Sequence, residues 1–154
     1  MPIIEHIFIA PEKRAEAKSV KTVNAIAECG LEGDRYSVAK NRKNSGQQIT
    51  FIEVEQIERF ISETGLLMGL HEPRRNIVTR GVDLNALVGK RFFVGECVFY
   101  GVELCEPCAI WAKNTHKEVV PFFVHRGGLN ARIVRGGVLS VGSSIEVESD
   151  LFNF

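Results

Sequence analysis

Apolar and polar residues alternate along most of this chain in short runs, and glycines separate many of the runs. A period of two residues is typical of strands that bury one face. Many short strands, glycine turns and few helices favour a mostly β fold, either a barrel or a sandwich. The expected strands are Pro2–Ala10, Ser19–Ala27, Gln48–Ile52, Arg75–Thr79, Arg91–Val94, Cys97–Leu104, Leu129–Val134 and Ser144–Val147.

One segment has a clear helical period instead. Between Glu53 and Glu63, apolar residues recur at intervals of three and four, which predicts an amphipathic helix that ends near Gly65. Val82 to Val88 predicts a single helical turn, and the polar, basic segment from Lys40 to Gln47 predicts a mobile loop. No repeat or linker divides the chain, so we expect one domain over residues 1–154.

The composition narrows the class of protein. Of the 154 residues, 45% are hydrophobic, which is enough for an ordinary core. The 19 basic and 19 acidic residues balance, so we expect no attraction to nucleic acid or to a membrane surface. No apolar run is long enough for a transmembrane helix, and the first residues lack the features of a signal peptide. These patterns predict a cytoplasmic protein with reduced cysteines.

Cys105 and Cys108 have the spacing C-x-x-C, which has several chemical interpretations. A zinc site needs four ligands, and only His116 and His125 follow, at unusual spacing. A thioredoxin-like redox pair needs a βαβ context that this sequence does not show. Either Cys108, which follows Pro107 in a loop, is a reactive thiolate with Cys105 beside it, or both thiols are small buried hydrophobes.

A basic cluster opens the segment that ends at these cysteines. Arg74, Arg75 and Asn76 stand at the start of an expected strand. Alternation places Arg74 and Asn76 on one face, where they can converge on an anion, and turns Arg75 away. The alternative is a pair of solvated arginines at a strand edge. Asp34 and Arg35, in a turn with two glycines, are either an exposed ion pair or part of a site.

Further polar residues accompany these two groups. Arg80 and Lys90 can extend the positive patch. His125 precedes two glycines and a strand, and a histidine near a thiol can lower the pKa of the thiol or move protons. The alternative is a structural or exposed histidine. Three side chains just after the cysteines are expected to line the same pocket: Trp111, Lys113 and His116.

Five segments taken together are more specific than any one of them. They are GLEGDRY at 30–36, QITFIE at 48–53, RRNIVTRGVDLNALVGKRFFVG at 74–95, VELCEPC at 102–108 and GGLNARIVRGG at 127–137. This combination resembles the MOSC domain, which occurs at the C-terminus of molybdenum cofactor sulfurases and as a stand-alone bacterial protein. The resemblance implies a closed or partly closed β-barrel and a cytosolic protein tied to molybdenum-cofactor or sulfur-transfer chemistry.

The resemblance also implies roles for single residues. Cys108 matches the family's hallmark cysteine, which is proposed to take sulfur as a persulfide from a pyridoxal-phosphate-dependent cysteine desulfurase and to pass it to a metal–sulfur centre. Arg74 and Asn76 match an Arg-x-Asn that contacts molybdopterin in pterin-binding relatives, and Arg35 is expected to help hold the phosphate. Cys105 would resolve the persulfide, and His125 would assist the thiol.

Three functions follow from the resemblance and stay open. A sulfur carrier would use Cys108 as a nucleophile. A molybdenum-cofactor-dependent reductase of N-hydroxylated compounds would use Cys108 as the thiolate ligand of molybdenum. In that branch the ligating cysteine lies further downstream, and this chain has no cysteine after Cys108. A non-catalytic binding module would use the cysteines only for packing.

Overall fold

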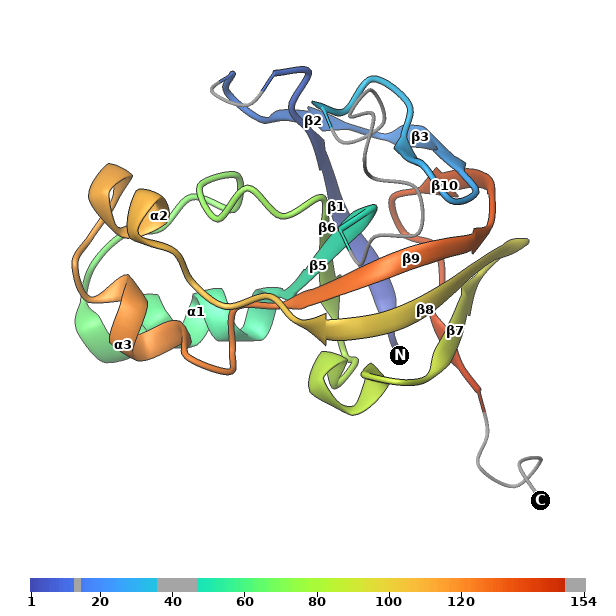
Figure 1. The fold of residues 1–154 in the computed structure, drawn as a ribbon. Helices are drawn as coiled ribbons and strands as arrows, with labels where there is room; N and C mark the ends of the chain where they lie inside the picture. Colours follow the sequence, from blue (N-terminus) through green and yellow to red (C-terminus); the bar gives the residue numbers. More distant parts are fainter. Residues whose placement is uncertain (13–14, 36–46, 149–154) are drawn as a thin grey trace.

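Most of the chain is β-sheet in the computed structural model, which describes residues 1–12, 15–35 and 47–148. Figure 1 shows a strongly curved sheet with the three α-helices gathered at one end. The elements are β1 (Ile3–Ile9), β2 (Lys18–Val20), β3 (Thr22–Ile26), β4 (Gly30–Leu31), β5 (Ile49–Glu53), α1 (Val54–Thr64), β6 (Ile77–Arg80), the 3-10 helix η2 (Leu84–Leu87), β7 (Arg91–Val94), β8 (Cys97–Leu104), α2 (Ala109–Asn114), α3 (Val119–Phe123), β9 (Leu129–Arg135), β10 (Gly137–Ser140) and β11 (Glu146–Val147).

The larger sheet of the described residues has eight strands in the order β11-β7-β8-β9-β5-β6-β1-β2. Its neighbours are antiparallel except β5 and β6, which run parallel. The sheet curls into a half-barrel that does not close, and a smaller sheet in the order β10-β3-β4 lies beside it. The predicted mostly β fold with a partly closed barrel is therefore confirmed.

The curvature has a local cause in the pairing of β8 with β9. Their register shifts between Val98 and Phe99 and again between Gly101 and Glu103. Such bulges bend a strand and increase its twist. A Cβ at Gly101 would lie 2.0 Å from the carbonyl oxygen of Leu87, so only glycine permits this close crossing of the chain.

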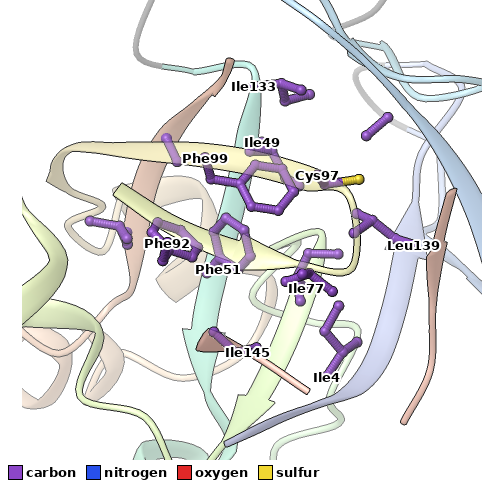
Figure 2. Close-up of a cluster of buried hydrophobic side chains, with 14 of the residues drawn as sticks. Ile4, Ile49, Phe51, Ile77, Phe92, Cys97, Phe99, Ile133, Leu139 and Ile145 are labelled. Atoms are coloured by element: carbon purple, nitrogen blue, oxygen red, sulfur yellow. The ribbon is translucent and has the colours of Figure 1, made fainter. Parts of the chain in front are cut away.

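Apolar side chains fill the inside of the half-barrel (Figure 2). Phe51 of β5, Phe92 of β7 and Phe99 of β8 meet with ring centroids 5.2 to 5.5 Å apart, and all three are 0% exposed. Cys97 points into the same core. Removal of these side chains from water favours folding and fixes the strands that carry the candidate site.

A second apolar cluster joins the three α-helices to the sheet. The predicted helix over Glu53–Glu63 is confirmed as α1, and its residues Val54, Ile57 and Phe60 are buried. Gly65 ends it with a φ of 72°, a conformation that glycine adopts without strain. The cluster also holds Trp111 of α2 and Phe123 of α3, whose ring centroids lie 4.5 Å apart.

Some elements differ from the prediction. The strand expected from Arg75 begins at Ile77, and α2 and α3 lie where no helix is expected. Helices of six and five residues are too short to show a helical period. The helical turn predicted over Val82–Val88 is confirmed as η2, while the loop predicted over 40–47 falls largely outside the described residues. None of the helices in the described ranges is both long and apolar enough to span a membrane.

Candidate functional site

Cys108 lies at the end of the loop that joins β8 to α2. We call Cys105–Cys108 the cysteine loop. Cys108 is the N-cap of α2, with φ −115° and ψ 164°, and its Sγ accepts a hydrogen bond from the backbone N–H of Trp111 at 3.4 Å. The side chain is nevertheless exposed. Its thiol is therefore both oriented by the helix start and open to a reaction partner.

The four cysteines, all within the described residues, differ in their surroundings. None forms a disulfide; Cys97 is buried, Cys29 and Cys105 are half-buried, and Cys108 is exposed. Burial raises the pKa of the Cys97 thiol. Burial also raises the pKa of the Cys105 thiol, and the positive charge of Arg75 opposes that rise. Of the four, Cys108 is the thiol best placed for chemistry with a second molecule.

Arg75 connects the basic cluster with the cysteine loop. Its side chain is buried, with the residue only 8% exposed. Its Nη2 donates to the carbonyl oxygens of Cys105 (3.4 Å) and Glu106 (3.2 Å). Its Nε donates to Gly127 O (2.9 Å) and its Nη1 to Pro73 O (3.0 Å). The prediction that Arg75 faces away from the site is wrong, because the chain is not yet a strand at this residue.

Arg74 also departs from strand geometry. Its φ is 60°, in the left-handed region that is rare for residues other than glycine. Its guanidinium reaches across to the segment after β1 and donates to the carbonyl oxygens of Ala15 and Glu12. The expected convergence of Arg74 and Asn76 does not come from strand alternation, since β6 begins only at Ile77.

Asn76 is buried and its amide joins three strands. Its Oδ1 accepts hydrogen bonds from the backbone N–H and the hydroxyl of Thr50 in β5, at 3.0 and 3.1 Å. Its Nδ2 donates to the carbonyl oxygen of Phe8 in β1 at 3.2 Å. The side chain therefore has a clear role in fixing β6 between β1 and β5.

A small hollow nevertheless brings the predicted cofactor residues together. Its cavity volume is about 10 Å³, within about 230 Å³ of empty space that includes open solvent. Asp34, for which an exposed ion pair was one of the two interpretations, is buried there and accepts a hydrogen bond from Ala10 N–H at 2.8 Å. We call this site the arginine hollow, and its lining residues are Phe8, Ala10, Ala17, Asp34, Arg35, Arg74, Arg75 and Asn76.

His125 is held against the cysteine loop by Glu106. The Oε1 of Glu106 accepts the backbone N–H of His125 at 2.7 Å, and its Oε2 lies 2.8 Å from the ring Nδ1. Asn85 Nδ2 donates to the carbonyl oxygen of His125 at 2.7 Å. His125 has φ 62° and is exposed, so these contacts fix a strained backbone and one ring nitrogen.

The three side chains expected beside the cysteines have separate positions. Trp111 is buried in the helix cluster, Lys113 is exposed on α2, and His116 Nε2 lies 2.8 Å from Leu67 O. None of them lines the arginine hollow. The described residues contain no group of three or more histidines, cysteines or acidic residues that could hold a metal ion.

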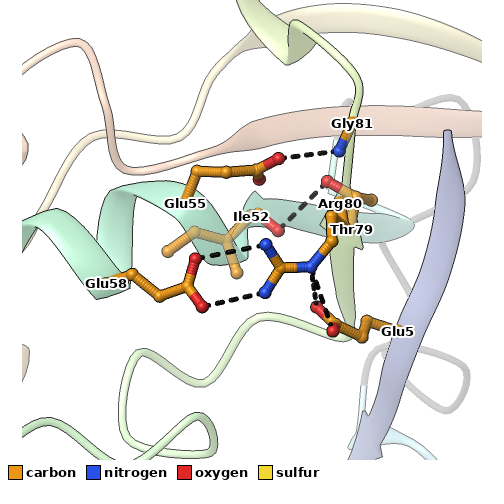
Figure 3. Close-up of polar contacts among 7 residues, drawn as sticks. All are labelled: Glu5, Ile52, Glu55, Glu58, Thr79, Arg80 and Gly81. Carbon is orange, nitrogen blue, oxygen red and sulfur yellow. Dashed lines mark hydrogen bonds and ion pairs between the residues drawn. The ribbon is translucent and has the colours of Figure 1, made fainter. Parts of the chain in front are cut away.

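Arg80 does not extend the positive patch, because it lies at the other end of β6 and is paired (Figure 3). Its Nε lies 3.1 Å from Glu5 Oε1, and its Nη2 lies 2.8 Å from Glu58 Oε2. Glu55 accepts the backbone N–H of Gly81 at 2.7 Å beside this pair. The charge of Arg80 is therefore matched by carboxylates.

Two residues of the site escape prediction from the sequence. Arg75 becomes central only because the irregular backbone before β6 turns its side chain inward. Glu106 lies between the two cysteines, but its contact with His125 joins positions 19 residues apart. The sequence places Glu106 in the cysteine loop and gives no sign of the partner of its side chain.

Comparison with known proteins places this geometry in a family. Residues 36–146 match the MOSC domain. The fold is similar to that of the YuaD protein from Bacillus subtilis, with a TM-score of 0.80, 19% identity and coverage of 97% of both chains. It is also similar to YiiM from Geobacillus stearothermophilus (TM-score 0.75, 14% identity, 97% of this chain and 76% of that one) and YiiM from Escherichia coli (0.66, 16%, 96% and 70%).

Among curated proteins, no significant match to the chain was found. The family match covers well over half of the chain and includes β5 to β9, the cysteine loop and both residues that flank Arg75. The structural similarity, at identities below 20%, independently supports the fold. The chain therefore belongs to the MOSC domain family, which is associated with functions related to the molybdenum cofactor.

Proposed function

We propose that this chain is a sulfur carrier of molybdenum-cofactor chemistry, with Cys108 as the residue that holds the sulfur. The observation that carries the proposal is the contrast among the cysteines: Cys108 is exposed and oriented at a helix start, and the other three are partly or fully buried. A carrier must present its thiol to two partners in turn. An exposed, positioned thiol meets that requirement.

Loading is a thiol–persulfide exchange. The Cys108 thiolate attacks the outer sulfur of a persulfide on the donor. A new S–S bond forms at Cys108, the donor's S–S bond breaks, and the donor leaves as a thiolate. No external oxidant or reductant is needed. The proposed donor is a pyridoxal-phosphate-dependent cysteine desulfurase, and the acceptor is a metal–sulfur centre.

Two residues at the cysteine loop have separate roles in this proposal. His125, whose Nδ1 is held by Glu106, takes the proton of the Cys108 thiol through its other ring nitrogen and so forms the attacking thiolate. Cys105 is half-buried and its pKa is raised by burial, so it reacts second: its thiolate attacks the Cys108 sulfur of the persulfide, a Cys105–Cys108 disulfide forms, and the outer sulfur leaves as hydrosulfide for the acceptor. The loop thus separates an accepting thiol from a resolving thiol.

The arginine hollow has a lining whose chemistry suits the phosphate end of a pterin cofactor. Its lining contains Arg35, Arg74 and Arg75 against the single carboxylate of Asp34. Guanidinium groups recognise phosphate oxygens in pairs. Its cavity volume, about 10 Å³, is far below the roughly 300 to 1,000 Å³ typical of pockets that enclose a whole small molecule. We therefore assign Arg35, Arg74 and Asn76 to the phosphate end alone.

The molybdenum cofactor, when bound, would supply a metal centre that exchanges sulfur or oxygen ligands. The residues of this chain would supply the charge that holds its phosphate and the thiol beside it. Asn76 acts here by fixing β6 beside the hollow, through its bonds to Thr50 and Phe8. Arg75 lies between the hollow and the cysteine loop.

The test is sulfur loading by a cysteine desulfurase and cysteine, followed by intact mass measurement. The unsubstituted chain should gain the mass of one sulfur atom, and a thiol reductant should remove it. Cys108→Ser should abolish the gain, while Cys29→Ser, the control at a half-buried cysteine outside the loop, should keep it. Retained loading in folded Cys108→Ser would reject the proposal.

The same preparation separates the two other functions. Near one molybdenum per chain, when the host makes the cofactor, would support a molybdenum-dependent reductase of N-hydroxylated compounds with Cys108 as the metal's ligand. Neither sulfur nor molybdenum, together with thiols that resist alkylation in the native state, would support a non-catalytic binding module. The exposure of Cys108 argues against unreactive thiols.

A further inference from the structure

We propose that Arg75 is a positioning residue that links anion binding in the arginine hollow to the reactivity of the cysteine loop. The role of this link in sulfur transfer rests on the proposed function. The link itself requires only that an anion in the hollow changes the reactivity of the Cys105 thiol. Arg75 is the residue shared by the two places: it lines the hollow and donates to two carbonyl oxygens of the loop.

The contacts of Arg75 clamp segments that are distant in the sequence. One guanidinium binds Cys105 and Glu106 in the loop and Gly127 just before β9. The loop approaches Gly127 so closely that a Cβ there would lie 2.3 Å from the carbonyl oxygen of Cys105. Cys105 N–H also donates to Gly128 O at 2.8 Å. The position of the Cys105 thiol therefore depends on the planar fork of Arg75.

The charge of Arg75 is not matched by an acid. Among the described residues no carboxylate pairs with it, whereas Arg59, Arg80, Arg91 and Arg132 each have a carboxylate partner. Carbonyl dipoles surround its guanidinium, and the Trp111 ring lies 5.3 Å from Cζ. A buried cation without a counter-ion strongly favours a nearby anion.

The positive charge of Arg75 can stabilise two anions, one in the arginine hollow and one in the cysteine loop. A phosphate in the hollow and a Cys105 thiolate in the loop are both stabilised by the same guanidinium, which already opposes the rise in the Cys105 pKa. Binding of either anion therefore weakens the stabilisation of the other, and the effect is reciprocal. An occupied hollow keeps Cys105 protonated, so a persulfide on Cys108 is protected from resolution.

The first experiment measures alkylation of each cysteine by peptide mapping, with inorganic phosphate or chloride at equal ionic strength. Phosphate should slow alkylation of Cys105 about two- to fivefold, as a coupling through one partly screened charge predicts. Cys29, equally half-buried but in the turn between β3 and β4, is the internal control and should not respond. Buried Cys97 reports unfolding, since it reacts only when the core opens.

The second experiment uses Arg75→Lys, which removes the planar guanidinium group but keeps the positive charge. An ammonium group cannot donate to carbonyls on three segments in one plane, so the loop should loosen. Alkylation of Cys105 should then approach the rate of Cys108, while Cys97 stays protected. The matched control is Arg132→Lys, whose guanidinium binds Glu28 at 2.7 Å instead of the loop, and which should leave Cys105 slow.

Two results would overturn the link. One is an equal response of Cys105 and Cys29 to phosphate, whether or not phosphate binds elsewhere. The other is a folded Arg75→Lys variant in which Cys105 stays as slow as in the unsubstituted chain. If Cys97 becomes reactive in that variant, the variant has unfolded and its Cys105 rate cannot test the link. The response of Cys105 to phosphate in the unsubstituted chain is then the test. Sulfur loading is not measured in either experiment, so failure of the link and failure of the sulfur-carrier proposal are seen separately.

Discussion

The two ends of β6 carry arginines in opposite situations. Arg80, at the carboxyl end, is half exposed and paired with Glu5 and Glu58. Arg75, before the amino end, is buried and bound only to carbonyl oxygens and an indole face. Both side chains make several hydrogen bonds, but only Arg80 has its charge matched by acids.

This difference separates a structural ion pair from a site. A matched pair on the surface contributes little to stability and has no charge left for a ligand. A buried, unmatched guanidinium is costly to keep unless the fold or a ligand uses it. Cys105, Glu106 and the arginine hollow all lie at the Arg75 end. The unmatched charge, more than the number of arginines, distinguishes the end of the strand where we propose the site.

The largest expected effect is the loss of Arg75. Arg75→Met keeps most of the apolar stem but leaves the carbonyl oxygens of Pro73, Glu106 and Gly127 without a donor. We expect the free energy of unfolding to fall by about 2 to 3 kcal/mol. Denaturant titration with intrinsic fluorescence measures it, and Trp111 is a suitable reporter beside the substitution.

Arg80→Met is the matched substitution at the other end of β6. It removes exposed ion pairs only, so its loss of stability should be several times smaller than that of Arg75→Met. Equal losses at the two ends would contradict the distinction between them. The thiol gives a second measure, since Arg75→Met should raise the pKa of Cys105 further and Arg80→Met should not change it.

A smaller contrast is expected between two buried polar side chains of the same region. Asn76→Ala leaves Thr50 N–H and Phe8 O without partners inside the sheet, which should cost about 2 kcal/mol of unfolding free energy. Thr79→Val, near the Arg80 end, removes one hydrogen bond to Ile52 O and keeps the shape, at a cost of about 1 kcal/mol or less.

Thermal and denaturant unfolding of both variants check this contrast. If Asn76→Ala were the milder change, the amide would not be the link between β1, β5 and β6 that its bonds indicate. A phosphate-binding measurement on Asn76→Ala adds a separate result. Weaker binding in a folded variant would support the predicted contact with the cofactor, and unchanged binding would limit Asn76 to its structural role.

The sequence was sufficient for elements whose signal is local. Alternation identified β1, β7 and β8, and the apolar period with Gly65 identified α1. The place of Cys108 in a loop after a strand allowed an exposed thiol, and the structure has the thiol exposed. These features depend on neighbours within a few residues, so their physical cause can be recognised in the chain itself.

Features that depend on distant neighbours could not be predicted in this way. α2 and α3 are held by packing of Trp111 and Phe123 in the helix cluster, and are too short for their own pattern. Arg75 faces the site because positive φ at Arg74 precedes it and carbonyls 30 and more residues away receive it. Tertiary contacts decide such positions, and local periodicity does not record them.

The smallest expected effect concerns Glu53. It pairs with Thr79 in the β5–β6 register, and so lies near the Arg80 end of β6. Burial raises the pKa of this carboxyl, Leu84 N–H opposes the rise, and the charge of Asp83 adds to it. Because the folded-state pKa lies above the unfolded one, the carboxyl stabilises the fold only while protonated. That contribution is complete below the unfolded pKa and is lost as pH rises through the folded pKa.

Glu53→Gln should therefore raise the free energy of unfolding at neutral pH by up to about 1 kcal/mol, a gain limited because the side chain is partly solvated. The amide oxygen can still accept from Leu84 N–H. The gain should shrink as pH falls below the folded pKa, where the carboxyl of the unsubstituted chain is also neutral. Denaturant titrations at acidic and neutral pH measure the difference, with Glu63→Gln, an exposed partner of Arg59, as the control. A gain that does not depend on pH would mean that packing, and not the buried charge, sets the cost of Glu53. The Arg80 end of β6 would then carry no unmatched charge.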